Sequence, residues 1–208
     1  MIPGDILLLF FAASVALALA PGPDNIFVLT QSVLQGRRAG VCVTLGLCTG
    51  LLGHIAAVAL GVAALLKTSA LAFAVLQAVG AAYLLYLAWQ SFRAGRAQID
   101  GPAGAGLSAR ALYGRGIVMN LSNPKVAIFF LAFLPQFTDP ARGAVVGQLI
   151  VLGLVFMLAA LLVFCAIAWA ASRIGAWLRR SPRLMLGMHR LAGVVFVLLA
   201  GRLLLAAP

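Results

Sequence analysis

The sequence predicts an all-α integral membrane protein with six transmembrane helices, and two observations lead to this fold class. Hydrophobic residues make up 64% of the 208 residues and charged residues only 9%, whereas soluble domains have about 25% charged residues. The apolar residues also gather in six runs, each long enough for a helix that crosses a hydrocarbon core of about 30 Å. These runs span about residues 6–34, 41–66, 69–92, 112–137, 144–171 and 187–206.

Basic residues predict the orientation of these helices. Most of them fall in the first, third and fifth connections, namely Arg37, Arg38, Arg93, Arg96, Arg110, Arg115, Arg173, Arg179, Arg180, Arg183 and Arg190. The opposite side carries only Lys67, Arg142 and Arg202. By the positive-inside rule the first, third and fifth connections are cytoplasmic, so both termini lie outside. The net charge of +11 therefore indicates contact with lipid headgroups and not binding of nucleic acid.

The first run begins with a segment that resembles a secretory signal peptide. Residues 6–20 are apolar and end in Ala18-Leu19-Ala20, a pattern suited to cleavage. No Lys or Arg precedes them, however, and cleavage would fall just before Pro21. We expect the segment to be retained as the start of the first helix.

A break interrupts the first run at PGPDN, residues 21–25. Pro21 and Pro23 each remove a helical hydrogen bond, Gly22 relaxes the backbone, and Asp24 is placed to cap a second half-helix from Asn25 onward. Capping alone would explain Asp24. It would not explain why a membrane helix is broken, because an unbroken helix leaves no backbone group unsatisfied. We therefore expect the break to take part in ligand binding or in gating.

The second run combines closely spaced glycines with a histidine. Gly46 and Gly50, followed by Gly53, have a spacing that lets another helix approach closely, either within one chain or across a dimer. His54 comes next and is the only histidine in the interior of an apolar run. It can hydrogen-bond a neighbouring helix, or it can couple protons or contact substrate; we favour the second interpretation.

The third run leads into a connection that divides the chain. Residues 93–111, which include GRAQIDGPAGAGLSAR, are rich in Gly and Ala and predict a flexible cytoplasmic linker. The linker separates residues 1–92 from 112–208 within a single transmembrane domain, 1–208. Each half has three helices, and because three is odd, the second half is expected to be an inverted repeat of the first.

The fourth run contains a second break, NLSNPK at residues 120–125. Ser122 or Asn123 can cap a half-helix whose first residue is Pro124, the position at which proline is best tolerated. Lys125 either snorkels to the interface or takes part in binding or gating, which we favour. Aligning Pro23 with Pro124 places Asp24 opposite Lys125, so both breaks carry a charge.

The remaining runs offer little chemistry. The fifth, 144–171, is nearly free of polar groups. Cys42, Cys48 and Cys165 lie inside apolar runs and are expected to be small buried residues. Their spacing forms neither a disulfide framework nor a zinc motif, so we expect no metal and no cofactor.

Three ionisable residues of the apolar runs are expected at similar depths, in the middle layer of the membrane. Counted from the cytoplasmic arginines, Asp24, His54 and Lys125 lie about 20, 24 and 15 Å deep. Together with the amides of Asn25, Asn120 and Asn123, they predict a pocket that offers a carboxylate, an ammonium and half-helix N-termini. Such a pocket suits a zwitterion, for example a free amino acid.

Three segments also carry a resemblance to a known family. APGPDNIFVL, the G-xxx-G-xx-GH stretch and NLSNPKVAIFFLAFLPQF resemble the signature segments of the lysine exporter family, which includes homoserine, threonine and leucine exporters. The resemblance implies a bacterial inner-membrane amino-acid exporter driven by the proton gradient. The positions that match the family's motifs are Pro21, Gly22, Pro23, Asp24, His54, Asn123, Pro124 and Lys125.

The leading hypothesis is export of a small amino acid or derivative by proton antiport. Another small solute as substrate, or a channel-like or structural subunit, remains the alternative. An enzyme using His54 and Asp24 is disfavoured, because the sequence contains no nucleophile motif and no H-E-x-x-H. The substrate, the direction of transport and the oligomeric state stay open.

Overall fold

The apolar runs form helices in the computed structural model, which describes residues 2–62, 70–93, 106–179 and 182–205. No strand occurs among these residues. The first half contains α1 (Gly4–Leu19), α2 (Pro23–Gln35), α3 (Arg37–Ala57), which continues into the π-helical turn η1 (Val58–Val62), and α5 (Ala70–Arg93). The second half contains α6 (Ala109–Leu121), α7 (Pro124–Ile128), the short turns η2 (Phe129–Phe133), η3 (Leu134–Phe137) and η4 (Pro140–Arg142), α8 (Val145–Arg179) and α9 (Pro182–Leu205).

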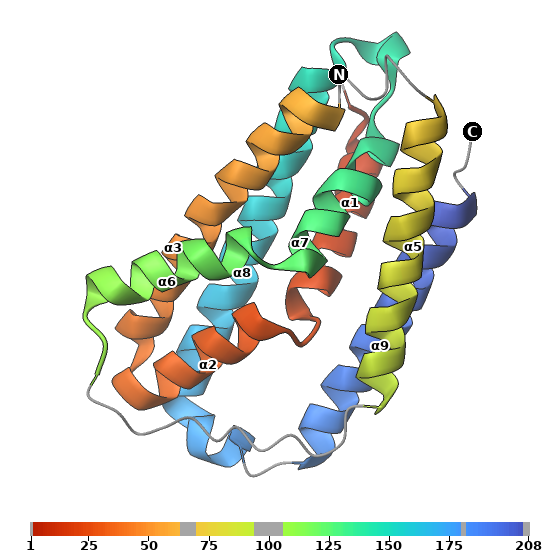
Figure 1. Cartoon of the computed structure of the whole chain (residues 1–208). Helices are drawn as coiled ribbons and strands as arrows, with labels where there is room; N and C mark the ends of the chain where they lie inside the picture. Colours follow the sequence, from red (N-terminus) through yellow and green to blue (C-terminus); the bar gives the residue numbers. More distant parts are fainter. Residues whose placement is uncertain (1, 63–69, 94–105, 180–181, 206–208) are drawn as a thin grey trace.

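The helices account for about six membrane spans, which confirms the expected fold class. Three segments are long and apolar enough to cross a membrane alone, namely Arg37–Gly61, Leu71–Arg93 and Val145–Ala171. Two further spans are bent pairs: α1 and α2 meet at 62°, and α6 and the segment Pro124–Phe137 meet at 48°. The 24-residue α9 packs along α5 and is the remaining long helix of the described residues (Figure 1). Both predicted breaks therefore interrupt a span.

The two halves of the chain run in opposite directions (Figure 1). In that view α1 and α2 descend, α3 ascends and α5 descends, whereas α6 and α7 ascend, α8 descends and α9 ascends. The start of α1 and the end of α9 consequently lie at the same end of the bundle. Each broken helix packs on the middle helix of the other half, α6 on α3 and both α1 and α2 on α8.

Several expected helix ends are wrong, because the apolar stretch marks the hydrocarbon layer and not the limit of the helix. The fifth helix continues past residue 171 to Arg179, and the sixth begins at Pro182 instead of 187. The fourth begins at Ala109, inside the expected linker. Arginine, which is frequent in these flanking turns, is a good helix former. Residues 94–105 of that linker lie outside the described residues, as does Lys67.

Aromatic side chains form the core where α1 and α8 meet the segment that follows the second break. The ring of Phe10 in α1 lies 4.9 Å from that of Phe137, and Phe156 in α8 lies 5.1 Å from both Phe129 and Phe130. Such tilted and edge-on pairs contribute about 0.5–1.5 kcal/mol each beyond simple burial. They fix α1 and α8 to the segment that follows the second break.

The cysteines only partly match their expected burial. Cys48 is buried, but Cys42 and Cys165 are partly exposed. Those two line a groove on the outside of the bundle together with Trp169 and the paired arginines that begin α3. On a membrane protein an outward-facing residue meets lipid, so its apolar setting in the sequence gives no information about burial in the protein.

Candidate functional site

The first break places proline where a helix tolerates it. α1 ends at Leu19, and α2 begins at Pro23 with Gly22 as its extended N-cap residue (φ −171°, ψ 177°). The expectation that Asp24 caps the second half-helix is wrong, because the helix starts two residues earlier than expected. Asp24 lies in the first turn of α2, where the helix dipole favours a carboxylate. Its side chain is thereby free to face the interior.

Asn25 ties the two halves of the broken helix together. Its Nδ2 donates a 2.6 Å hydrogen bond to the backbone oxygen of Ala18 in the last turn of α1. The bond is buried and spans the break. Asn25 therefore holds the bend at the first break.

The second break has the capping geometry expected of it. Asn123 is the N-cap of α7, its Oδ1 accepts a 3.0 Å hydrogen bond from the backbone N–H of Lys125, and Pro124 is the first helical residue. Ser122, the other capping candidate, belongs instead to the end of α6, where its hydroxyl donates to the backbone oxygen of Val118 at 2.8 Å.

Lys125 joins the two breaks. Its Nζ donates to the backbone oxygens of Leu17 at 3.2 Å and Ala20 at 2.9 Å, at the end of α1. A helix leaves its last carbonyls unpaired and partly negative there, so the ammonium satisfies and stabilises that end. Lys125 is only 6% exposed and does not snorkel to an interface. A Cβ at Gly22 would lie 3.2 Å from Nζ, so glycine permits this approach.

Asn120 connects Asp24 to His54. Its Nδ2 donates to Asp24 Oδ2 at 3.3 Å, and its backbone oxygen lies 3.0 Å from His54 Nε2. Since a carbonyl oxygen only accepts, Nε2 must carry the hydrogen in this contact. His54 therefore reaches the carboxylate through Asn120 and not directly.

The glycines of α3 make this arrangement sterically feasible within one chain. A Cβ at Gly46 would lie 2.2 Å from the backbone oxygen of Tyr113, and one at Gly50 would lie 2.8 Å from Asn120 Cβ. A Cβ at Gly53 would lie 2.6 Å from Leu121 Cδ2. Each of these contacts is made with α6. The close approach therefore places Asn120 against His54.

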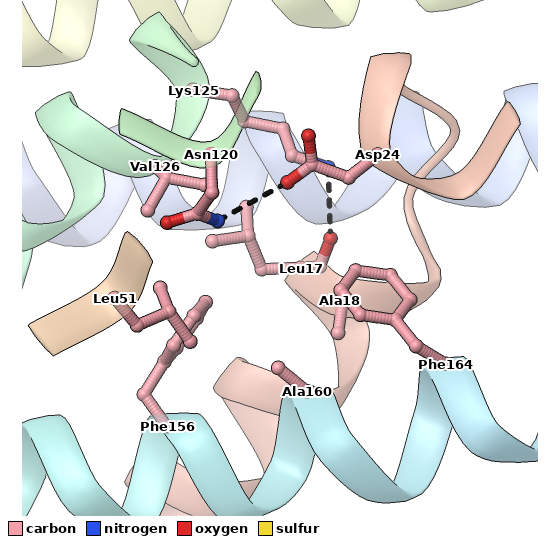
Figure 2. A pocket seen from close by; sticks show the side chains of 10 residues that line it. All are labelled: Leu17, Ala18, Asp24, Leu51, Asn120, Lys125, Val126, Phe156, Ala160 and Phe164. Atoms are coloured by element: carbon pink, nitrogen blue, oxygen red, sulfur yellow. Dashed lines mark hydrogen bonds between the residues drawn. The ribbon is translucent and has the colours of Figure 1, made fainter. Parts of the chain in front are cut away.

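A small pocket lies between the two breaks and α8 (Figure 2). Its volume is about 10 Å³, enough for one water. Asp24, Asn120 and Lys125 supply its polar side. The other lining residues are apolar: Leu17, Ala18, Leu51, Val126, Phe156, Ala160 and Phe164. Asp24 and Lys125 face the same space, and no ion pair joins them in the described part of the chain.

Comparison with known proteins assigns a family to this architecture. A family model described as LysE type translocator matches residues 15–207, almost the entire chain. The chain belongs to the LysE-type translocator family. The resemblance seen in the sequence is thereby confirmed.

The LysE-type translocator has bacterial relatives of similar length. It is 37% identical over 199 residues to the homoserine/homoserine lactone efflux protein of Salmonella typhimurium, covering 95% of each chain. It is 28% identical over 197 residues to the leucine efflux protein of Klebsiella pneumoniae, covering 94% of this chain and 93% of the other. An uncharacterized membrane protein of Vibrio cholerae is 33% identical over 190 residues, with 91% and 92% covered. No solved structure matches significantly.

Helical spans and bacterial relatives together support a bacterial inner-membrane location for this translocator. Within the described ranges, no group of three or more His, Cys, Asp or Glu side chains could hold a metal ion.

The site of this LysE-type translocator has unused hydrogen-bonding capacity. Four buried polar atoms close to the breaks have no hydrogen-bond partner among the described residues, namely Asp24 Oδ1, Asn25 Oδ1, Asn120 Oδ1 and Asn123 Nδ2. An unpaired buried polar group costs about 1–3 kcal/mol. Of their residues, Asp24 and Asn120 line the pocket, whereas Asn25 and Asn123 hold the breaks beside it.

Sequence reasoning missed two parts of the site. The carbonyls of Leu17 and Ala20 bind Lys125, but backbone groups leave no signal in a sequence. The second part is the side of the pocket that α8 forms, which was missed because the fifth run lacks polar residues. The four-residue spacing of Phe156, Ala160 and Phe164 marks one helical face, yet other faces of the same helix are equally apolar.

Proposed function

We propose that this LysE-type translocator exports a small amino acid or derivative across the inner membrane in exchange for protons. The observation that carries the proposal is the pocket in which Asp24 and Lys125 face one space from two broken helices without forming an ion pair. Relatives named as efflux proteins for homoserine and for leucine support an amino-acid substrate.

The two charges suit the two ends of an amino acid. The free Oδ1 of Asp24 and the free Oδ1 of Asn120 accept hydrogen bonds from the substrate's ammonium. An ammonium has three N–H donors, and Lys125 directs two of them to carbonyls of α1. Its third donor is available to the substrate's carboxylate. Each charge of the ligand thus meets an opposite charge, as burial requires.

Transport requires the pocket to open. At about 10 Å³ it holds a water but not an amino acid, so the structure corresponds to a closed state. We propose that residues 1–92 and 112–208 form inverted halves that rock against each other around the breaks. Two features support this: the halves run in opposite directions, and each broken helix packs on the other half's middle helix.

Coupling to protons follows from competition for Asp24. A carboxylate that holds a proton no longer attracts the substrate's ammonium, so one carboxylate carries either the proton or the substrate. A charge that crosses the field gains about 2.3 kcal/mol per 100 mV. His54, linked to Asp24 through Asn120, is placed to exchange protons with this site or to hold Asn120 in position.

The decisive experiment measures amino-acid efflux from cells loaded with a dipeptide mixture, with and without the protein. Faster release of one or a few amino acids into the medium, read by mass spectrometry, would support the proposal. Release that slows when the proton gradient is collapsed would support antiport. Unchanged release of every amino acid, with the protein present in the membrane, would refute amino-acid export and favour another small solute.

A further inference from the structure

One face of α8 closes the pocket opposite its charged side. Phe156, Ala160 and Phe164 follow one another at intervals of four residues, and all three line the pocket. They are buried, with 3%, 2% and 5% of their surfaces exposed. Figure 2 shows them along one edge of α8, across the pocket from Asp24 and Lys125. The pocket therefore has a charged side and an apolar side.

The apolar side is held rigidly at one end. The ring of Phe156 lies 5.1 Å from the rings of both Phe129 and Phe130, which are themselves fully buried. In a core packed this densely, a ring cannot turn aside without displacing its neighbours. Ala160 is the small residue between the two aromatic residues of this face, so the space above its methyl group is where a ligand can extend.

We propose that Ala160 sets the upper size limit for the substrate's side chain and that this side chain is uncharged. The inference rests on the proposed function, in which Asp24 and Lys125 hold the ammonium and the carboxylate of an amino acid. With both ends fixed there, the side chain points toward α8.

The lining residues also determine the charge of the substrate's side chain. Asp24 and Lys125 are the only charged residues among them, and both are engaged by the two ends of the substrate. A second positive or negative charge on the substrate would be buried against Phe156, Ala160 and Phe164 without a partner, which is strongly unfavourable. The site therefore selects amino acids with short aliphatic or hydroxyl side chains.

The effect of residue 160 on discrimination between substrates has a predictable magnitude. One methylene more or less in an apolar pocket changes discrimination by roughly 10–200-fold. Ala160→Val adds two methyl groups to the wall and should lower efflux of leucine relative to alanine by about 10-fold or more. Ala160→Gly removes a methyl group and should shift the ratio in the opposite direction, toward larger substrates.

The experiment compares efflux of glycine, alanine, homoserine, leucine, phenylalanine and lysine from cells that carry each variant. Ala166→Val is the matched control, because Ala166 lies on the exposed side of the same helix. It should keep the wild-type ratios. Membrane levels are measured for every variant, and if the valine variant does not accumulate, the glycine variant decides, since it adds no bulk.

The outcomes separate the two proposals. Shifted ratios in the Ala160 variants alone would support this inference. Wild-type efflux with unchanged ratios in both variants would overturn the role of Ala160 and leave amino-acid export standing. Lysine efflux by the wild type would refute the inference that the substrate's side chain is uncharged. No efflux of any amino acid by the wild type would refute the proposed function itself.

Discussion

At the scale of single residues, Asp24 is the carboxylate on which the proposed exchange depends. It is 2% exposed, and one of its oxygens is bonded by Asn120 while the other is free. Asp24→Asn keeps the shape and an acceptor oxygen but removes the charge. We expect efflux to fall about 100-fold, because a buried charge partner is worth about 2–5 kcal/mol. Efflux per amount of membrane protein measures this loss.

A control for Asp24 lies in the preceding half-helix. Asp5 is an exposed carboxylate at the start of α1, and Asp5→Asn removes the same charge away from the pocket. It should leave efflux unchanged. Normal efflux in the Asp24 variant would end the role of that carboxylate.

Lys125 has a structural role as well as the proposed contact with substrate. Lys125→Met removes the ammonium from the backbone oxygens of Leu17 and Ala20 and leaves Ala20 O without this donor, whereas Leu17 O keeps the backbone N–H of Ala20. The change should cost about 1–3 kcal/mol of stability. We expect a lower melting temperature in detergent together with loss of efflux. Arg110→Met, which removes an exposed cation from α6, should change neither measurement. An unchanged melting temperature in the Lys125 variant would argue against the contact with α1.

His54 tests whether proton coupling extends beyond Asp24. His54→Gln keeps an N–H donor for the backbone oxygen of Asn120 but removes the imidazole, a group that can bind and release a proton. We expect efflux to persist and its pH dependence to flatten. His189→Gln, at the other histidine of the chain, is the control. A wild-type pH profile in the His54 variant would assign His54 to helix packing.

At the scale of elements, the close packing of α3 on α6 positions the site. Gly50→Ala would place a Cβ 2.8 Å from that of Asn120, so the two helices must separate or Asn120 must move. We expect a loss of about 1–3 kcal/mol, as for other overpacked cores, and a reduced efflux rate. Thermal unfolding of the purified protein measures the first effect.

Gly114 in α6 provides the matched control for that substitution. A Cβ at Gly114 would meet nothing within 4 Å, and alanine favours the helix by up to about 1 kcal/mol. Gly114→Ala should therefore leave efflux unchanged and leave stability equal or slightly higher. Equal behaviour of the two alanine variants would contradict tight α3–α6 packing.

At the scale of the whole molecule, the arrangement of the helices predicts the topology. The start of α1 and the end of α9 lie at the same end of the bundle, and the distribution of arginines predicts that this end is outside. Alkaline phosphatase fused to either terminus should be active, and a green fluorescent protein fused there should be dark. Fluorescence at both termini would reverse the orientation, and fluorescence at only one would contradict an even number of spans.

Much of the fold could be predicted from the sequence, but only part of the site. Apolar runs locate membrane helices, and the pair Asn123-Pro124 predicts the start of α7 with Asn123 as its N-cap. Both signals can be recognised because they act over a few residues. The start of α2 was misplaced by two residues, since Pro23 fits a first turn as well as it ends a preceding helix. Contacts between distant segments, such as Lys125 with the end of α1, have no local signal.

The sequence by itself determined a helical membrane protein of about six spans, the two breaks, and the residues that are costly to bury. Composition and proline chemistry are properties of short segments, so they can be read along the chain. The tertiary structure alone decided that Asn120 links Asp24 to His54, that Lys125 closes the end of α1, and that Ala160 faces the charges. Those relations depend on how six helices pack, and many packings satisfy the same apolar pattern.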